Sequence, residues 1–177
     1  MNAIQIVTIK NKIPLFKGDE KAERIELIQL EENGFELVSQ KDLYQVGDKA
    51  VYIQPDYCLS DIPLFEGFIR PNDKDGNPDE SKSMLGKVGG LPRRIRAKKF
   101  NFHRGDGNSI YSNGILLPYK EVQEVIGAKS MFHEFKLENY DLAQELQITK
   151  YEEPETNSSS GVKGGSSMAF PQGIIRT

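Results

Sequence analysis

Residues 24–40 read RIELIQLEENGFELVSQ, two strand-like runs (RIELIQL, 24–30, and FELVSQ, 35–40) joined by a short polar turn. The turn contains Asn33-Gly34, and Asn-Gly between two such runs is a strong short-range signal for a β-hairpin. The stretch therefore predicts a pair of antiparallel strands.

Further strand signals flank this hairpin on both sides. They lie at residues 3–9, 49–55 (KAVYIQP), 93–102 and 110–119 (IYSNGILLPY). The KAVYIQP run is rich in β-branched and aromatic residues, which are typical of a pleated, half-buried surface. Residues 72–82 (NDKDGNPDESK) are dense in Asp, Asn, Gly and Pro and predict an exposed loop. Short strands without an alternating βαβ pattern predict a mainly β fold, a small closed five-stranded barrel rather than a parallel sheet.

The C-terminal third has a different character. Residues 120–126 (KEVQEVI) and 139–148 (NYDLAQELQI) space their apolar residues as short amphipathic helices that pack on the barrel. Residues 152–167 are rich in Gly and Ser and have the composition of a flexible linker. We therefore expect a barrel domain at 1–126, a short helical extension at 127–151 and a linker at 152–177.

Composition excludes several classes of protein. The chain has 177 residues, 37% of them hydrophobic, and no apolar run approaches the roughly 18 residues of a membrane span. Neither its N-terminus nor its single cysteine, Cys58, suggests secretion, so we expect a cytoplasmic or nuclear protein. With only His103 and His133 beside that cysteine, a zinc site of the usual Cys/His kind lacks ligands.

A basic segment runs from residue 86 to residue 105, although the net charge of the chain is −3. The segment contains no Asp or Glu, and its cations are Lys87, Arg93, Arg94, Arg96, Lys98, Lys99 and Arg104. Alternate residues of a strand share a face. A continuous strand would therefore place on one side Arg94, Arg96, Lys98, Phe100, Phe102 and Arg104. Cations meet phosphates and rings stack on bases, so this face predicts nucleic-acid binding. The alternative is a solvated strand face whose two Phe rings are covered by a neighbouring loop.

The quartet Arg104-Gly105-Asp106-Gly107 differs from the Lys-x-Asp-Gly motif of covalent nucleotidyltransferases only at its first residue, which is Arg instead of Lys. In that motif a lysine amine attacks the α-phosphate of ATP. A guanidinium stays protonated and has no free lone pair, so Arg104 is not expected to be a nucleophile. The quartet instead has the composition of a turn between two strands.

Several segments together carry a resemblance to a known family. They are VGDKAVYIQPDYCLSD (46–61), FEGFIR (65–70), RIRAKKF (94–100), YSNGILLP (111–118), LAQELQITKYEEP (142–154) and FPQGIIRT (170–177). In this order they resemble the N-terminal part of nick-sealing ATP-dependent RNA ligases, in which an OB domain precedes the nucleotidyltransferase domain. The resemblance implies an OB-fold barrel that helps to hold RNA or a nicked RNA-containing duplex. It also implies a downstream catalytic domain that uses ATP and Mg²⁺, while this chain itself holds no cofactor.

On this reading Arg94, Arg96, Lys98 and Arg104 contact phosphates, Phe100 and Phe102 stack or pack, and Lys87, Arg93 and Lys99 add long-range attraction. We expect no catalytic residue and no metal ligand in the chain. Two other functions stay open. The first is a protein-interaction module whose basic strand binds an acidic partner or the chain's own acidic tail. The second is a free-standing OB protein that acts with a separate catalytic subunit.

Overall fold

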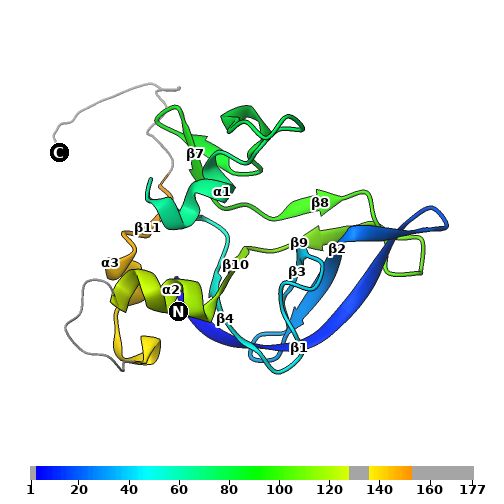
Figure 1. The fold of residues 1–177 in the computed structure, drawn as a ribbon, viewed down its shortest axis with the longest axis horizontal. Helices are drawn as coiled ribbons and strands as arrows, with labels where there is room; N and C mark the ends of the chain where they lie inside the picture. Colours follow the sequence, from blue (N-terminus) through cyan, green and yellow to red (C-terminus); the bar gives the residue numbers. More distant parts are fainter. Residues whose placement is uncertain (1–2, 128–135, 153–177) are drawn as a thin grey trace, which may run out of the picture.

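A computed structural model describes residues 3–127 and 136–152. The fold is mainly β and is built on a strongly curled five-stranded sheet, a half-barrel with the strand order β10-β4-β1-β2-β3 (Figure 1). Its strands are β1 (Ile4–Lys17), β2 (Glu20–Leu30), β3 (Glu36–Gln40), β4 (Lys49–Ile53) and β10 (Ile115–Pro118). All neighbouring pairs in this sheet are antiparallel. The mainly β, five-stranded prediction is confirmed.

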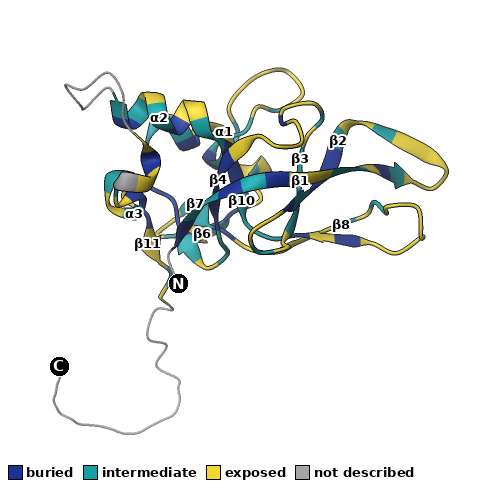
Figure 2. Ribbon diagram, turned by 90° about the horizontal axis from the view of Figure 1, so that it is seen from below, coloured by how far each residue is buried: buried dark blue, intermediate teal, exposed yellow. Residues whose placement is uncertain are grey.

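The hairpin predicted at residues 24–40 is confirmed as β2 and β3. Ile28 pairs with Leu37, and the turn is closed by the Gly34 N–H, which donates to the Leu30 carbonyl. Gly34 has a φ of 70°, a left-handed conformation that glycine adopts without steric cost. A second hairpin joins β1 to β2 around Gly18, and its tip extends beyond the barrel, where it is exposed (Figure 2).

Strand β4 separates two hydrophobic cores. Because side chains alternate along a strand, Ala50 and Tyr52 face a core inside the half-barrel, while Val51 and Ile53 face a core under the helices. All four are fully or almost fully buried (Figure 2). This explains why the sequence of the strand is apolar throughout.

The prediction of one strand over residues 110–119 is wrong, because the chain bends within it. Strand β9 (Ile110–Ser112) lies beside β3, where the Val38 N–H donates to Ser112 Oγ at 2.9 Å. The chain then turns at Gly114, whose φ is 90°, and continues as β10 along β4. The segment 110–118 therefore spans the two edges of the half-barrel and narrows the opening between them.

The basic strand predicted at residues 93–102 is also not continuous. It is divided between β7 (Leu91–Arg94) and β8 (Lys98–Phe100), with residues 95–97 outside any strand. The interruption occurs where the chain leaves one sheet for another. Ile95 is buried and fixes the chain at this point, where it passes from β7 to β8. Its N–H donates to the Tyr57 carbonyl, and its own carbonyl accepts from the Asp56 N–H.

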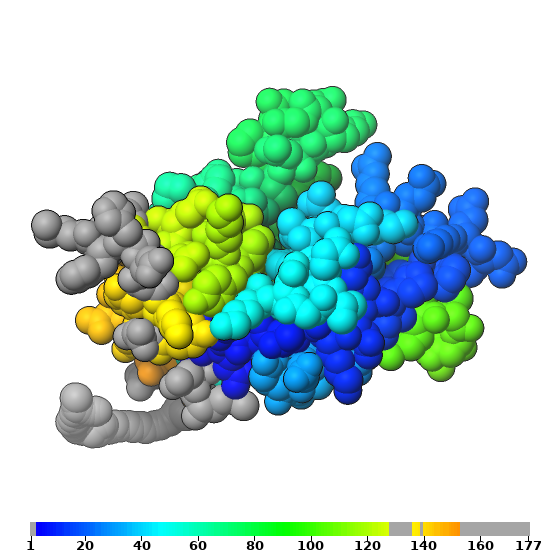
Figure 3. Space-filling model, turned by 60° about the horizontal axis from the view of Figure 1, so that its bottom comes forward, coloured from blue at the N-terminus to red at the C-terminus, as the bar shows by residue number. Residues whose placement is uncertain are grey.

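Residues 54–97 form an insertion beside the half-barrel. Its elements are β5 (Tyr57–Cys58), η1 (Pro63–Phe65), α1 (Glu66–Ile69), η2 (Glu80–Lys82), β6 (Gly86–Val88) and β7. Its strands belong to a small sheet with the order β11-β5-β7-β6, in which β11 is the short C-terminal strand Thr149–Lys150. The predicted loop at 72–82 is mostly exposed and projects as a lobe from the surface (Figure 3).

The helices of the C-terminal part cover the second core. The helix predicted at residues 120–126 is confirmed as α2 (Tyr119–Gly127), but that at 139–148 is reduced to one turn, α3 (Leu142–Glu145), preceded by η3 (Leu137–Asn139). Strand β11 (Thr149–Lys150) then pairs with β5. The linker predicted at 152–177 lies outside the described residues from position 153 onward. Within the described part, no helix combines the length and apolar character needed to cross a membrane.

Candidate nucleic-acid interface

A groove with a volume of about 430 Å³ lies between the half-barrel and the insertion. Strands β3 and β10 provide one wall through Leu37 and Leu116, and the insertion provides the other wall through Phe68 and Leu85. Figure 1 shows α1 and β7 beside the end of the sheet that carries β10. The groove is therefore a product of tertiary packing between segments that are distant in the sequence.

Arg96 and Lys98 line this groove, where the chain crosses from the insertion to β8. Both are exposed, and neither forms an ion pair with any described residue. The Arg96 stem passes over Gly86, since a Cβ built there would lie 3.4 Å from Arg96 Cδ. The structure thus brings together these two predicted phosphate ligands beside an apolar surface.

Two other predicted cations are exposed but lie elsewhere. Lys99 is directly opposite Tyr111 in the β8–β9 pair, and the Tyr111 side chain is 56% exposed. Because side chains alternate along β8, Lys99 points away from the face shared by Lys98 and Phe100. Lys87 is exposed on β6. Their contribution to long-range attraction stays a prediction.

The remaining predicted cations are already engaged. Arg93 Nε donates to the Leu59 carbonyl at 2.7 Å. Arg94 forms an ion pair with Asp56 at 2.7 Å, and its guanidinium lies 4.0 Å from the centroid of the Tyr151 ring.

Arg104 forms a two-pronged ion pair with Glu36, and this pairing raises the pKa of its guanidinium. The Arg104-Gly105-Asp106-Gly107 quartet belongs to the turn between β8 and β9, as its composition predicts. Gly105 and Gly107 both have positive φ in this turn. An arginine held in this way is a structural link between the turn and β3.

Phe100 and Phe102 pack rather than stand free. Both are half-buried against a core cluster of Leu15, Leu27 and Ile110. The next residue, His103, stacks on Phe16 with ring centroids 5.8 Å apart, which ties this turn to the β1–β2 hairpin. The shared face predicted from strand parity is therefore divided into a packed part and an open part.

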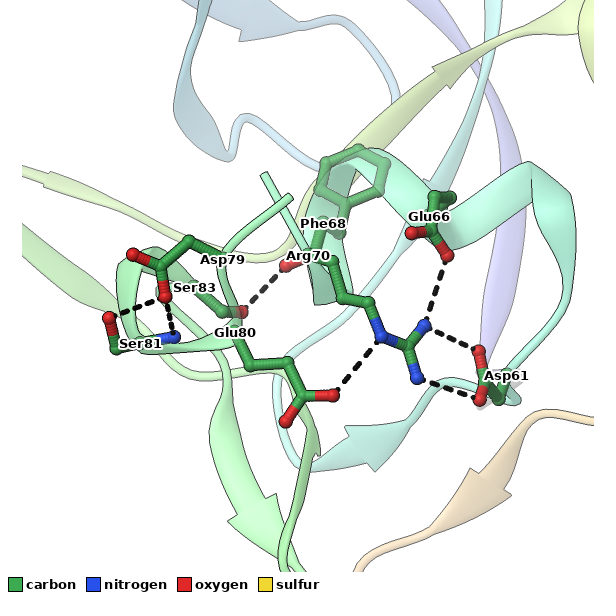
Figure 4. Close-up of polar contacts among 8 residues, drawn as sticks. All are labelled: Asp61, Glu66, Phe68, Arg70, Asp79, Glu80, Ser81 and Ser83. Atoms are coloured by element: carbon green, nitrogen blue, oxygen red, sulfur yellow. Dashed lines mark hydrogen bonds and ion pairs between the residues drawn. The ribbon is translucent and has the colours of Figure 1, made fainter. Parts of the chain in front are cut away.

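A polar network around Arg70 fixes the insertion wall of the groove (Figure 4). The Arg70 guanidinium binds Asp61 through two hydrogen bonds of 3.0 and 3.1 Å. It also contacts Glu66 at 3.0 Å and Glu80 at 3.1 Å. Because Arg70 lies just before the 72–82 loop and Glu80 lies near its end, the ion pair between them joins the two ends of this loop. The hydrogen bond from Arg70 lowers the pKa of the Asp61 carboxyl. Ser83 completes the wall by donating its hydroxyl to the Phe68 carbonyl at 2.6 Å.

Sequence reasoning missed several groove residues. Lys82 lies in a loop without periodicity, and Leu43 and Met84 lie outside any strand or helix, each next to a buried apolar residue. Leu43 and Met84 line the groove and are 45% and 52% exposed. No local sequence signal distinguishes them from other surface residues.

Comparison with known proteins identifies a shared fold. No protein-family model matches the sequence, and no curated protein matches it either. Among solved structures, the chain is similar to a variant of Naegleria gruberi RNA ligase with AMP and manganese, with a TM-score of 0.55 and 21% identity. The same ligase with pyrophosphate gives a TM-score of 0.54 and 22% identity, and a variant with ATP and manganese gives 0.54 and 24%.

These alignments cover 91%, 92% and 91% of this chain but only 38%, 39% and 38% of the ligase. The chain therefore spans less than half of the ligase's length. At this level of identity the likeness is one of fold.

Proposed function

We propose that this chain is the RNA-binding OB domain of an ATP-dependent RNA ligase that seals 3′-hydroxyl and 5′-phosphate ends in nicked RNA-containing duplexes. Support comes from the fold shared with an RNA ligase over about nine-tenths of the chain. The ring of β1, β2, β3, β9–β10 and β4 agrees with a partly open five-stranded barrel of the OB type.

The observation that carries the proposal is the division of the cations into engaged and available groups. Among the seven cations of the 86–105 segment, Lys87, Arg96, Lys98 and Lys99 form no ion pair with a described residue, and neither does Lys82 at the groove. They occur within a short stretch of the chain, although its overall charge is negative. Cations that are not neutralised by nearby carboxylates can exchange their counterions for phosphates.

Ligation chemistry is assigned to a part of the ligase outside this chain. Covalent adenylation needs a deprotonated lysine amine, whereas the nearest motif here begins with Arg104, which is bound to Glu36. We expect ATP and Mg²⁺ to bind a nucleotidyltransferase domain in the full-length ligase. The role of this chain is to hold the RNA beside that domain.

Salt dependence of RNA binding tests the proposal. With phosphate contacts from the three groove cations, Lys82, Arg96 and Lys98, at roughly 0.7–0.9 counterions each, log affinity for a nicked duplex should fall against log salt with a slope between about −2 and −3. Fluorescence anisotropy with a labelled nicked RNA duplex measures it. A slope near zero would contradict phosphate binding.

Single substitutions locate the binding face. Arg96→Ala and Lys98→Ala should each weaken binding and make the slope shallower by about 1. Lys74→Ala removes the same charge from the exposed 72–82 loop and serves as the matched control. Equal effects of all three variants would indicate diffuse attraction without a defined face.

A further inference from the structure

We propose that the groove between the half-barrel and the insertion binds one unpaired nucleotide of the RNA. Its base would lie on the apolar lining, and its flanking phosphates would meet the cations at the rim. This inference rests on the proposed function and extends it from phosphate binding to recognition of an RNA end or gap.

The charge of the groove indicates an anionic occupant. Its lining contains three cations, Lys82, Arg96 and Lys98, and no Asp or Glu. They come from both sides, since Lys82 ends η2 and Lys98 begins β8. An occupant in the groove would therefore meet positive charge on two sides.

The apolar lining indicates that this anion also has a flat, poorly hydrated part. Of the apolar lining residues that are at least partly exposed, Val38 and Ile115 come from the half-barrel, and Phe68 and Met84 come from the insertion. Nucleobases combine such faces with attached phosphates, and proteins that bind single strands pair cationic grooves with stacking surfaces.

The size of the groove favours a single nucleotide. Its volume of about 430 Å³ lies within the range of roughly 300–1,000 Å³ that small-molecule sites occupy. A paired base offers only its edge to a protein, whereas an unpaired base can turn its face into a pocket. Ser39 and Gln40 on β3 also line the groove and supply hydrogen-bonding groups for a base edge.

The insertion wall is held in place before any ligand arrives. Arg70 joins Asp61 to Glu80, and Ser83 joins the Phe68 carbonyl to the Leu85 N–H, so the segment that carries Phe68 and Lys82 is fixed at several points (Figure 4). A fixed wall reduces the entropy lost on binding. The 72–82 loop thus acquires a function, because its ends position one side of the groove.

The test compares two RNA duplexes that differ by one unpaired nucleotide. The full chain is titrated with a blunt duplex and with the same duplex carrying a one-nucleotide 3′ overhang. Three variants are compared: Leu43→Glu and Met84→Glu, which place a carboxylate at the groove, and Val46→Glu. Val46 is 62% exposed, lies in the same loop as Leu43 and does not line the groove, so it is the matched control. Circular dichroism confirms that each variant is folded.

The wild-type chain and Val46→Glu should bind the overhang duplex about fivefold or more tightly than the blunt duplex, as expected for stacking of one base. Leu43→Glu and Met84→Glu should abolish this preference. If both duplexes bind with equal affinity, or if Val46→Glu acts like Leu43→Glu, the nucleotide site is refuted while RNA binding stands, and an acidic peptide becomes the occupant to assay. Failure of the wild-type chain to bind either duplex would refute the proposed function itself.

Discussion

Replacing Gly114 by alanine should destabilise the half-barrel more than a comparable substitution elsewhere. Gly114 lies where the chain passes from β9 to β10, and its φ is 90°. A Cβ at this position would lie 2.6 Å from the Ile53 carbonyl oxygen and 2.6 Å from Cε1 of Tyr52. The carbonyl belongs to the backbone, and Tyr52 is buried with its hydroxyl donating to the Asn113 carbonyl. Neither neighbour can move without breaking β-sheet or core contacts.

The magnitude follows from separate contributions. A left-handed backbone costs an L-residue about 1–2 kcal/mol. Alanine also lowers the conformational entropy of the unfolded chain, and this offsets about 0.4–1 kcal/mol of that cost. Overpacking a filled site adds about 1–3 kcal/mol. Gly114→Ala should therefore lower the free energy of unfolding by about 3 kcal/mol, equivalent to a fall of about 6–12 °C in Tm for a chain of this size.

Gly76→Ala is the matched control. Gly76 has a φ of 84°, but a Cβ there would meet no atom within 4 Å. Gly76→Ala forces an L-residue into a positive φ but brings its Cβ into no steric clash, so the free energy of unfolding should fall by about 1 kcal/mol or less. Urea unfolding followed by far-UV circular dichroism measures both variants and suits a chain without tryptophan. Equal losses for Gly76→Ala and Gly114→Ala would refute the close approach of Gly114 to Tyr52 and Ile53 of β4.

Three other predictions concern the engaged side chains. Arg94→Ala should lower Tm, because it removes the contact with Tyr151, but should leave the salt slope of RNA binding unchanged; a shallower slope would show that Arg94 contacts phosphate. The pKa of Asp61 is lowered in the folded state, so its ionised carboxyl stabilises the fold at pH values above the usual aspartate pKa of about 4. This stabilisation is lost as the pH falls through the folded-state pKa. Asp61→Asn should therefore reduce the loss of unfolding free energy between neutral and acidic pH in urea titrations, and an unchanged pH profile would argue against the bond to Arg70. Incubated with labelled ATP and Mg²⁺, the chain should acquire no covalent AMP, since Arg104 cannot attack the α-phosphate, and label on the chain would overturn this assignment.

Local sequence signals determined much of the half-barrel. The Asn33-Gly34 turn specified the β2–β3 hairpin because glycine adopts positive φ at no steric cost. The apolar run at 49–53 indicated β4, and the amphipathic pattern at 120–126 indicated α2. These elements were predictable because their signals depend on neighbouring residues alone.

The two broken strands show where local signals fail. Residues 93–102 and 110–119 each read as one strand, yet each changes sheet partners midway, at Ile95 and at Gly114. A change of partner is decided by packing and hydrogen bonds with distant residues, such as Tyr57 and Ile53. Strand propensity carries no information about those partners.

The candidate site likewise has features that follow from the sequence and features that depend on the tertiary structure. The sequence by itself determined that the region 86–105 is basic and free of carboxylates, because charge is a property of each residue. Only the tertiary structure decided which cations are available, because Asp56 and Glu36, far away in sequence, neutralise Arg94 and Arg104 and leave Arg96 and Lys98 at the groove. Neutralisation depends on distances of a few ångströms between charged atoms, and such distances are fixed by folding and not by order along the chain.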